Sequence, residues 1–163
     1  MKKIISLIIA TIVIFSVFCM VASAGDYYMM LAQVDNNRLF VNATSMDFDA
    51  ENPNVAPSMD EEGTVLIPLR MVVGAAGGWI DWVAEEDKVV MLYNGVESSF
   101  VMGSNQINVG DEIIEVSTEI YTTHDRTMVP LDFFIKCMKA GAEFDKDTKT
   151  AMLAFETTVY AAN

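Results

Sequence analysis

Hydrophobic and polar positions change their period along the chain, and two segments carry the period of a helix. Residues 66–82 and 128–144 both begin with two apolar residues followed by Pro-Leu. Apolar positions then recur at the i, i+3, i+4, i+7 spacing of a helix with one buried face. These positions are Leu69, Val72, Val73 and Ala76 in the first segment and Leu131, Phe134, Ile135 and Met138 in the second. The pattern predicts two short helices that repeat at a constant offset of 62 residues.

Pro68 and Pro130 predict where the two helices start. Proline is favoured at the first helical position, because its φ is preset and its missing N–H would be unpaired there. The residue before a proline is pushed towards an extended conformation, so strands should run directly into the helices. Because left-handed helix ends favour glycine, we expect Gly77-Gly78 to end the first helix and Gly141 to end the second.

Outside these helices the apolar period becomes two, which is typical of β-strands. Asn94-Gly95 and Gly110-Asp111 are hairpin turn signals. Residues 49–63 hold two prolines, one glycine and five acids, and predict a mobile loop. Strands are expected over residues 27–34, 38–42, 45–48, 89–92, 99–102, 106–109, 112–116 and 151–155. The chain is therefore predicted to be an α+β domain of short antiparallel strands with two short proline-led helices and an imperfect internal duplication.

The first 24 residues have the pattern of a secretory signal peptide. Lys2 and Lys3 precede an apolar run, and Ala22-Ser23-Ala24 offers a small-residue cleavage site. Cleavage after Ala24 would place the protein in the extracellular space or the cell wall. The rival interpretation is an uncleaved membrane anchor, since the apolar run is just long enough to span a bilayer at roughly 20 residues.

Removal of this segment would leave an acidic protein of one domain. Residues 25–37 would form an N-terminal extension or an extra strand, and residues 38–163 the domain itself. The full chain has a formal charge of −13, and the loss of two lysines would make it −15. Nucleic acids and anionic membrane surfaces both require a basic patch, so we expect no nucleic acid partner and no membrane association after cleavage.

Several short motifs in this chain resemble the copper amine oxidase N-terminal domain family, also called the stalk domain, of secreted and surface proteins of Gram-positive bacteria. The motifs are Phe40-Val41-Asn42, the run from Val65 to Arg70 that contains Ile-Pro-Leu-Arg, Gly77 to Trp82, Ile107 to Gly110, and Asp125 to Leu131. In the second copy the chain departs from the family pattern. Asp132 stands where the family favours Arg, Lys139 where it favours Gly, and Phe144 where it favours Trp; in the first copy Gly74 replaces a frequent Glu. The resemblance implies a fold without catalytic chemistry of its own.

Candidate chemistry is sparse, so no catalytic residue, metal site or cofactor is predicted. A catalytic copper amine oxidase, as the resemblance implies, needs three histidine ligands, and His124 is the only histidine. Asp47, Asp49 and Glu51 alternate like the start of a calcium loop, but the glycine and glutamate that such a loop requires are missing. Cys137, the only cysteine after the predicted cleavage, is expected to be a buried thiol.

The sequence thus predicts a non-catalytic module outside the cytoplasm that contacts an unknown protein or a cell-wall polymer. A secreted inhibitor or a carbohydrate-binding protein remains an alternative, and a small extracellular hydrolase is a more distant one. Arg70, Trp79 and the 49–63 loop are the candidate contact residues. Strand alternation would put Trp79 on the face of its strand opposite to Trp82, with Trp82 in the core. Trp79 either packs beneath a neighbouring loop or stacks on a sugar ring.

Overall fold

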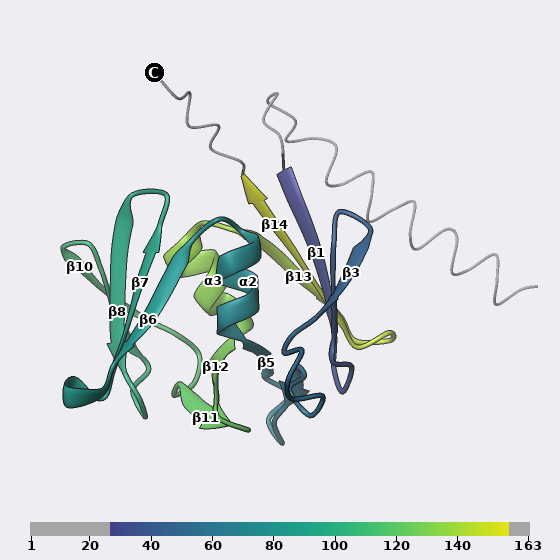
Figure 1. The fold of residues 1–163 in the computed structure, drawn as a ribbon, viewed down its shortest axis with the longest axis horizontal. Helices are drawn as coiled ribbons and strands as arrows, with labels where there is room; N and C mark the ends of the chain where they lie inside the picture. The colour runs from purple at the N-terminus through teal and green to yellow at the C-terminus, as the bar shows by residue number, and fades with distance from the viewer. Residues whose placement is uncertain (1–26, 157–163) are drawn as a thin grey trace, which may run out of the picture.

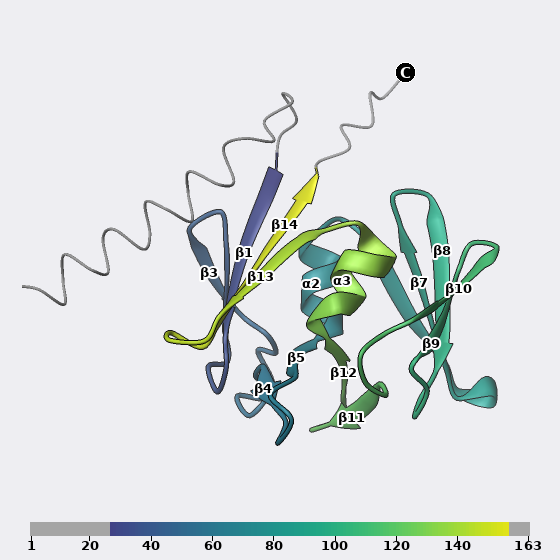
Figure 2. The same ribbon diagram turned by 180° about the vertical axis from the view of Figure 1, so that it is seen from behind.

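The computed structural model describes residues 27–156 of the 163-residue chain, so the predicted signal peptide lies outside the described residues. Two five-stranded antiparallel sheets flank a central pair of helices, and a four-stranded sheet closes one end (Figures 1 and 2). The elements are β1 (Tyr27–Gln33), β2 (Arg38–Val41), β3 (Thr44–Asp47), β4 (Ser58–Met59), β5 (Val65–Pro68), α2 (Leu69–Ala75), β6 (Trp79–Val83), β7 (Lys88–Tyr93), β8 (Val96–Val101), β9 (Gln106–Val109), β10 (Glu112–Glu115), β11 (Tyr121–Thr123), β12 (Arg126–Pro130), α3 (Leu131–Met138), β13 (Gly141–Asp145) and β14 (Thr150–Glu156).

Three sheets organise these strands. The terminal sheet has the order β13-β14-β1-β2-β3, and the meander sheet has the order β10-β9-β8-β7-β6. The small sheet has the order β11-β12-β5-β4. Every strand pair in them is antiparallel. The predicted 49–63 loop is not a free loop, because it contains β4 and buries Val55.

The predicted α+β class is wrong, because the fold is β-rich. Fourteen strands lie within residues 27–156, against two α-helices of seven and eight residues. The prolines do not lead the helices either. Pro68 and Pro130 are the last residues of β5 and β12, with extended backbone and strand partners in the small sheet. Each helix begins one residue later, as a short connection between two strands.

The duplication is visible in the strand pairing. Ile80 pairs with Met91, and 62 residues later Ala142 pairs with Leu153. The pair Ile67–Val129 in the small sheet joins two positions that are themselves 62 residues apart. An approximate two-fold axis therefore passes between β5 and β12 and exchanges the two helices and the two five-stranded sheets.

Each repeat contributes strands to both large sheets. The β9–β10 hairpin of the second repeat extends the meander sheet, and the β2–β3 hairpin of the first repeat extends the terminal sheet. The N-terminal strand β1 takes the place beside β14 that β8 takes beside β7. The Asn94-Gly95 turn between β7 and β8 has two positive φ angles, as the sequence predicts for this hairpin.

One hydrophobic core joins both sheets to the helices. Phe133 packs edge-to-face on Phe100 of β8 at 5.7 Å between ring centroids. Its neighbour Phe134 packs in the same way on Phe155 of β14 at 6.3 Å. Because α3 lies between two sheets, adjacent side chains point to opposite sheets and both are buried. The predicted stripe is therefore wrong at Ile135, which is 43% exposed.

The two helices end differently. Gly77 follows α2 with φ +81°, and the Gly78 N–H donates to the Val73 carbonyl at 2.8 Å, so the predicted Gly-Gly ending is confirmed. The predicted ending at Gly141 is wrong. Lys139 takes the left-handed position after α3, and Gly141 is the first residue of β13. Within residues 27–156, neither helix has the length and apolar character needed to cross a membrane.

Candidate functional site

A pocket of about 290 Å³ opens between the edge strand β6, the start of α2 and the β11–β12 hairpin. Its walls are both apolar and polar. Ile80 and Val89 lie at its base, where they meet the core. The remaining lining residues are Arg70, Asp81, Trp82, Thr122, Asp125, Arg126 and Thr127. Two guanidinium groups, two carboxylates and one indole thus share this hollow.

Arg70 is the first of the two guanidinium groups. It is the second residue of α2, and its side chain is exposed at the pocket. No residue within 27–156 forms a hydrogen bond or an ion pair with its guanidinium. Both other arginines have carboxylate partners, in the pairs Arg38–Asp47 and Arg126–Asp49. Arg70 therefore offers all of its N–H donors to solvent or to a ligand.

Trp82 provides the aromatic wall. It pairs with the buried Val89 across β6 and β7, so its side chain lies on the inner face of the meander sheet. The alternation predicted for this strand is confirmed, but the predicted burial is wrong, since Trp82 is 40% exposed. The physical reason is that β6 is the edge strand of its sheet, and the pocket rather than core lies beside the ring.

Trp79 lies on the other face of β6. It pairs with Leu92 of β7 and is 55% exposed, so no loop covers it. It does not line the pocket with Arg70. The two predicted contact residues therefore belong to different surfaces: Arg70 shares the pocket with Trp82, and Trp79 lies on the outer face of the meander sheet.

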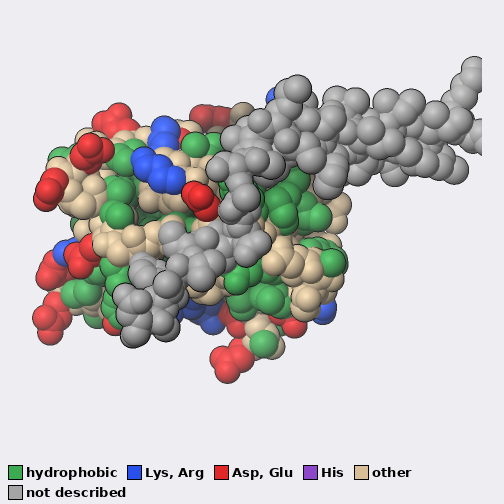
Figure 3. All heavy atoms as spheres, turned by 90° about the horizontal axis from the view of Figure 1, so that it is seen from above, with side chains coloured by type: hydrophobic (Ala, Val, Ile, Leu, Met, Phe, Trp, Pro, Cys, Tyr) green, Lys and Arg blue, Asp and Glu red, His purple; other side chains and the backbone are tan. Residues whose placement is uncertain are grey.

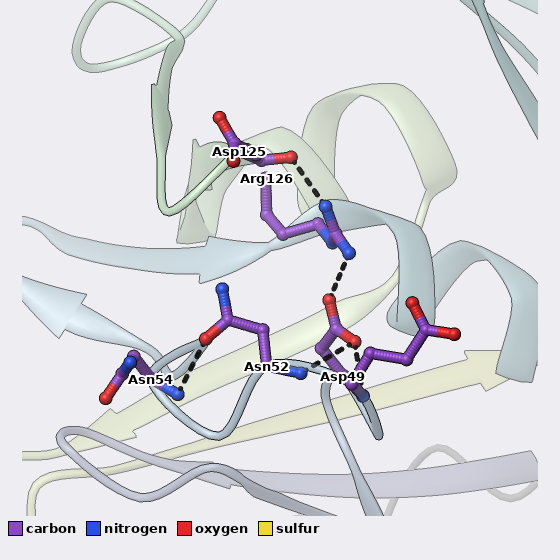
Figure 4. A network of polar contacts seen from close by, with 6 residues as sticks. Asp49, Asn52, Asn54, Asp125 and Arg126 are labelled. Carbon is purple, nitrogen blue, oxygen red and sulfur yellow. Dashed lines mark hydrogen bonds and ion pairs between the residues drawn. The ribbon is translucent and has the colours of Figure 1, made fainter.

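Arg126, the second guanidinium, is held in place (Figure 4). One guanidinium nitrogen donates to the backbone carbonyl of Asp125 at 2.9 Å, and another forms an ion pair with Asp49. The Asp125 carboxylate points away from this guanidinium in the close-up. Because two of its contacts are already made within the protein, Arg126 keeps a fixed position at the pocket wall and still has further donors.

Asp49 links the 49–63 segment to the pocket. Its carboxylate accepts the backbone N–H groups of Glu51 and Asn52, at 2.9 and 3.2 Å, in addition to the ion pair with Arg126. The hydrogen bond from Glu51, together with Arg126, lowers the pKa of Asp49 below its ordinary value. The sequence reading missed this contact, because nothing in the local pattern joins Asp49 to Arg126.

His124 lies outside this pocket, in the turn between β11 and β12, and lines a wider hollow of about 720 Å³. Backbone turns and amide side chains form much of that hollow, including Asn36, Asn37 and Asn54. Within residues 27–156, no three His, Cys, Asp or Glu side chains converge in an arrangement that could hold a metal ion. The absence of a metal site and of a cofactor stays a prediction.

Cys137 lies on the buried side of α3, as predicted. Burial raises the pKa of its thiol to about 12, and the nearby Asp132 adds to this effect. The thiolate, which is the reactive form of cysteine, is therefore strongly disfavoured at neutral pH. This side chain packs the core.

These features define a class of protein: a β-rich, internally duplicated domain with a small pocket where the first repeat meets the β11–β12 hairpin of the second. Residues 40–153 match the family described as the copper amine oxidase N-terminal domain, and the chain belongs to this family. Within that family, this domain is the non-catalytic part. No curated protein and no solved structure matches the chain.

Proposed function

We propose that the protein is a non-catalytic module that works outside the cytoplasm, secreted or in the cell wall, and binds a cell-wall polymer through the pocket of Arg70 and Trp82. The observation that carries this proposal is that a guanidinium without a partner among residues 27–156 shares one hollow with a half-exposed indole. Binding pockets combine apolar walls with a few well-placed polar groups, and this pocket has that composition.

The N-terminal pattern supports the location. The lysine pair, the apolar run and the Ala22-Ser23-Ala24 site are the features of a secreted precursor. N-terminal sequencing of the protein from culture and wall fractions should give Gly25 as the first residue. Recovery of intact Met1 in the membrane fraction would instead identify an anchored protein.

A protein partner is the second candidate, and the outer face of the meander sheet favours it. Trp79, its pair Leu92 and Ile113 are all exposed on that sheet, and Ile113 is 68% exposed. Acidic side chains gather at the end of the molecule that this sheet forms (Figure 3). A contact of this kind would suit a partner with an apolar patch and a basic rim.

A sedimentation assay with purified cell wall and a pull-down of secreted proteins distinguish the two candidates. The variant Trp82→Ala should lose wall binding, and Trp79→Ala, on the same strand but the opposite face, should keep it. If Trp79→Ala loses a protein captured in the pull-down and Trp82→Ala still captures it, the protein-contact candidate is correct. Turnover of amines above background by the purified, copper-loaded protein would contradict the non-catalytic role.

A further inference from the structure

The pocket also indicates what kind of ligand it takes. We propose that it binds one pyranose ring carrying a carboxylate, as part of an acidic glycan. This inference rests on the proposed binding role of the pocket and adds the chemistry of the ligand.

Size is the first argument. A volume of about 290 Å³ lies just below the range of about 300–1,000 Å³ that is usual for ligand pockets. It leaves room for a single ring with its substituents, beside the edge strand β6. A glycan can place one unit there while its neighbours stay in solvent.

The distribution of polar groups is the second argument. A pyranose has flat faces of C–H groups and a rim of hydroxyls. Trp82 offers a flat aromatic wall, and Ile80 and Val89 extend it towards the core. Thr122, Thr127 and Asp125 supply hydroxyl and carboxylate groups for hydrogen bonds with sugar hydroxyls. The apolar wall of the pocket therefore matches the C–H face of a sugar ring, and its polar rim matches the hydroxyl groups.

Charge is the third argument. Arg70 has no partner within residues 27–156, while Arg126 is fixed by Asp49 and by the Asp125 carbonyl. A planar guanidinium recognises carboxylates through paired N–H donors. Two carboxylates, Asp81 and Asp125, also line the pocket, but within residues 27–156 neither pairs with Arg70, and Asp81 accepts the Trp82 backbone N–H at 2.8 Å. A neutral sugar would leave Arg70 without an ionic partner, whereas a carboxylate-bearing ring would provide one.

Trigalacturonate is a suitable probe, because each of its rings carries one carboxylate. Maltotriose offers similar rings without charge, and an acetylated dipeptide with a free C-terminal carboxylate offers the charge without a sugar. Isothermal titration of the purified protein should detect trigalacturonate binding that is at least about tenfold tighter than binding of either control ligand.

Variants test the assigned residues. Arg70→Gln and Trp82→Ala should each weaken trigalacturonate binding by at least about tenfold, because each removes one of the two main contacts. Trp79→Ala should change it by less than about twofold, because its side chain lies on the opposite face. If the alanine variant is unstable, Trp82→Leu replaces it: this variant keeps an apolar side chain but removes the aromatic face, and it should also weaken trigalacturonate binding.

Several outcomes would overturn the inference: no binding of trigalacturonate, equal affinity for maltotriose, tighter binding of the dipeptide, or unchanged affinity in both Arg70→Gln and Trp82→Ala. These outcomes can be distinguished from a failure of the proposed wall-binding function. If Trp82→Ala abolishes sedimentation with cell wall while trigalacturonate does not bind, the wall-binding role stands and the acidic sugar is the wrong ligand.

Discussion

Equivalent positions in the two repeats have taken on opposite tasks. Position 70 in the first repeat is Arg70, which is exposed at the pocket and has no partner in the described part of the chain, residues 27–156. Its equivalent, 62 residues later, is Asp132, whose carboxylate accepts the backbone N–H and the hydroxyl of Ser117 at 3.0 and 2.9 Å. Lys136 adds an ion pair at 2.9 Å. The guanidinium at the first position is exposed at the pocket, and the carboxylate at the second is bonded to Ser117 and Lys136.

The aromatic positions differ in the same direction. Trp82 lines the pocket, whereas its equivalent Phe144 packs against the core. The repeats exchange roles at a third pair: Arg126 of the second repeat lines the pocket, whereas the backbone N–H of its first-repeat equivalent Thr64 bonds to Asp60 within a turn. One duplicated scaffold thus carries a polar pocket on one side and internal contacts on the other. The difference teaches that two symmetry-related places in a duplicated fold can keep the same backbone pairing while their side chains line a pocket at one and make contacts within the fold at the other.

The largest expected effect concerns α3, where the second repeat anchors both sheets. Phe134→Ala should lower the free energy of unfolding by about 3–5 kcal/mol, because a fully buried ring leaves a cavity between α3 and β14. Ile135→Ala, one residue along the same helix and 43% exposed, should cost much less. Equal losses in urea unfolding would show that the burial pattern of α3 is wrong.

A smaller effect separates Gly78 from its equivalent Ala140. A Cβ at position 78 would lie 2.8 Å from a Val73 methyl and 3.0 Å from the Leu92 carbonyl oxygen, so Gly78→Ala should cost about 1–3 kcal/mol. The reverse change, Ala140→Gly, removes a buried methyl and should cost about 1 kcal/mol. Thermal unfolding of both variants tests this pair. A Gly78→Ala protein as stable as the wild type would contradict the close approach of Gly78 to Val73 and Leu92.

Asp132 should make the second repeat sensitive to acid. Burial alone would raise the pKa of Asp132, but hydrogen bonds from Lys136 and Ser117 outweigh it and lower the pKa below the ordinary 3.8. Its contribution to stability is therefore complete above pH 3.8 and is lost as the pH falls towards the lowered native value. Asp132→Asn should cost about 1 kcal/mol at neutral pH, since solvent screens part of the interaction, and should flatten the acid side of the stability profile. If the dependence of stability on pH is unchanged in Asp132→Asn, Asp132 does not cause the predicted loss of stability in acid.

The smallest effect on stability is expected at the equivalent position of the first repeat. Arg70→Gln should change the free energy of unfolding by less than about 0.5 kcal/mol, because the guanidinium is exposed and makes no bond within residues 27–156. Chemical denaturation measures this directly. A loss as large as that of Asp132→Asn would mean that Arg70 serves the fold and not a ligand.

Local pattern predicted much of the strand framework. The Asn94-Gly95 hairpin, the offset of 62 residues and the buried stripe of α2 all follow from turn chemistry and periodicity, which act over a few residues. The β-rich fold class could not be predicted from these local patterns. Very short strands such as β4 are formed by pairing with a distant buried strand, and the two residues of β4 carry no periodic signal of their own.

The candidate site was predictable only in part. Arg70 was identified, but alternation could say only that Trp82 faces inward, not that an edge strand leaves it beside a pocket. The pair of Asp49 and Arg126 joins residues 77 positions apart and depends on tertiary structure. Trp79 was identified for its exposure, and the structure places it on a different surface.

The two tryptophans allow the most direct test of the claim that the pocket of Arg70 and Trp82 is the binding site. The chain has only two, so incorporation of fluorotryptophan gives two ¹⁹F resonances, which Trp79→Phe and Trp82→Phe assign. On addition of solubilised cell-wall glycan, the account predicts that the Trp82 resonance shifts and the Trp79 resonance stays in place. A shift of Trp79 alone, or no shift at saturating glycan, would contradict it.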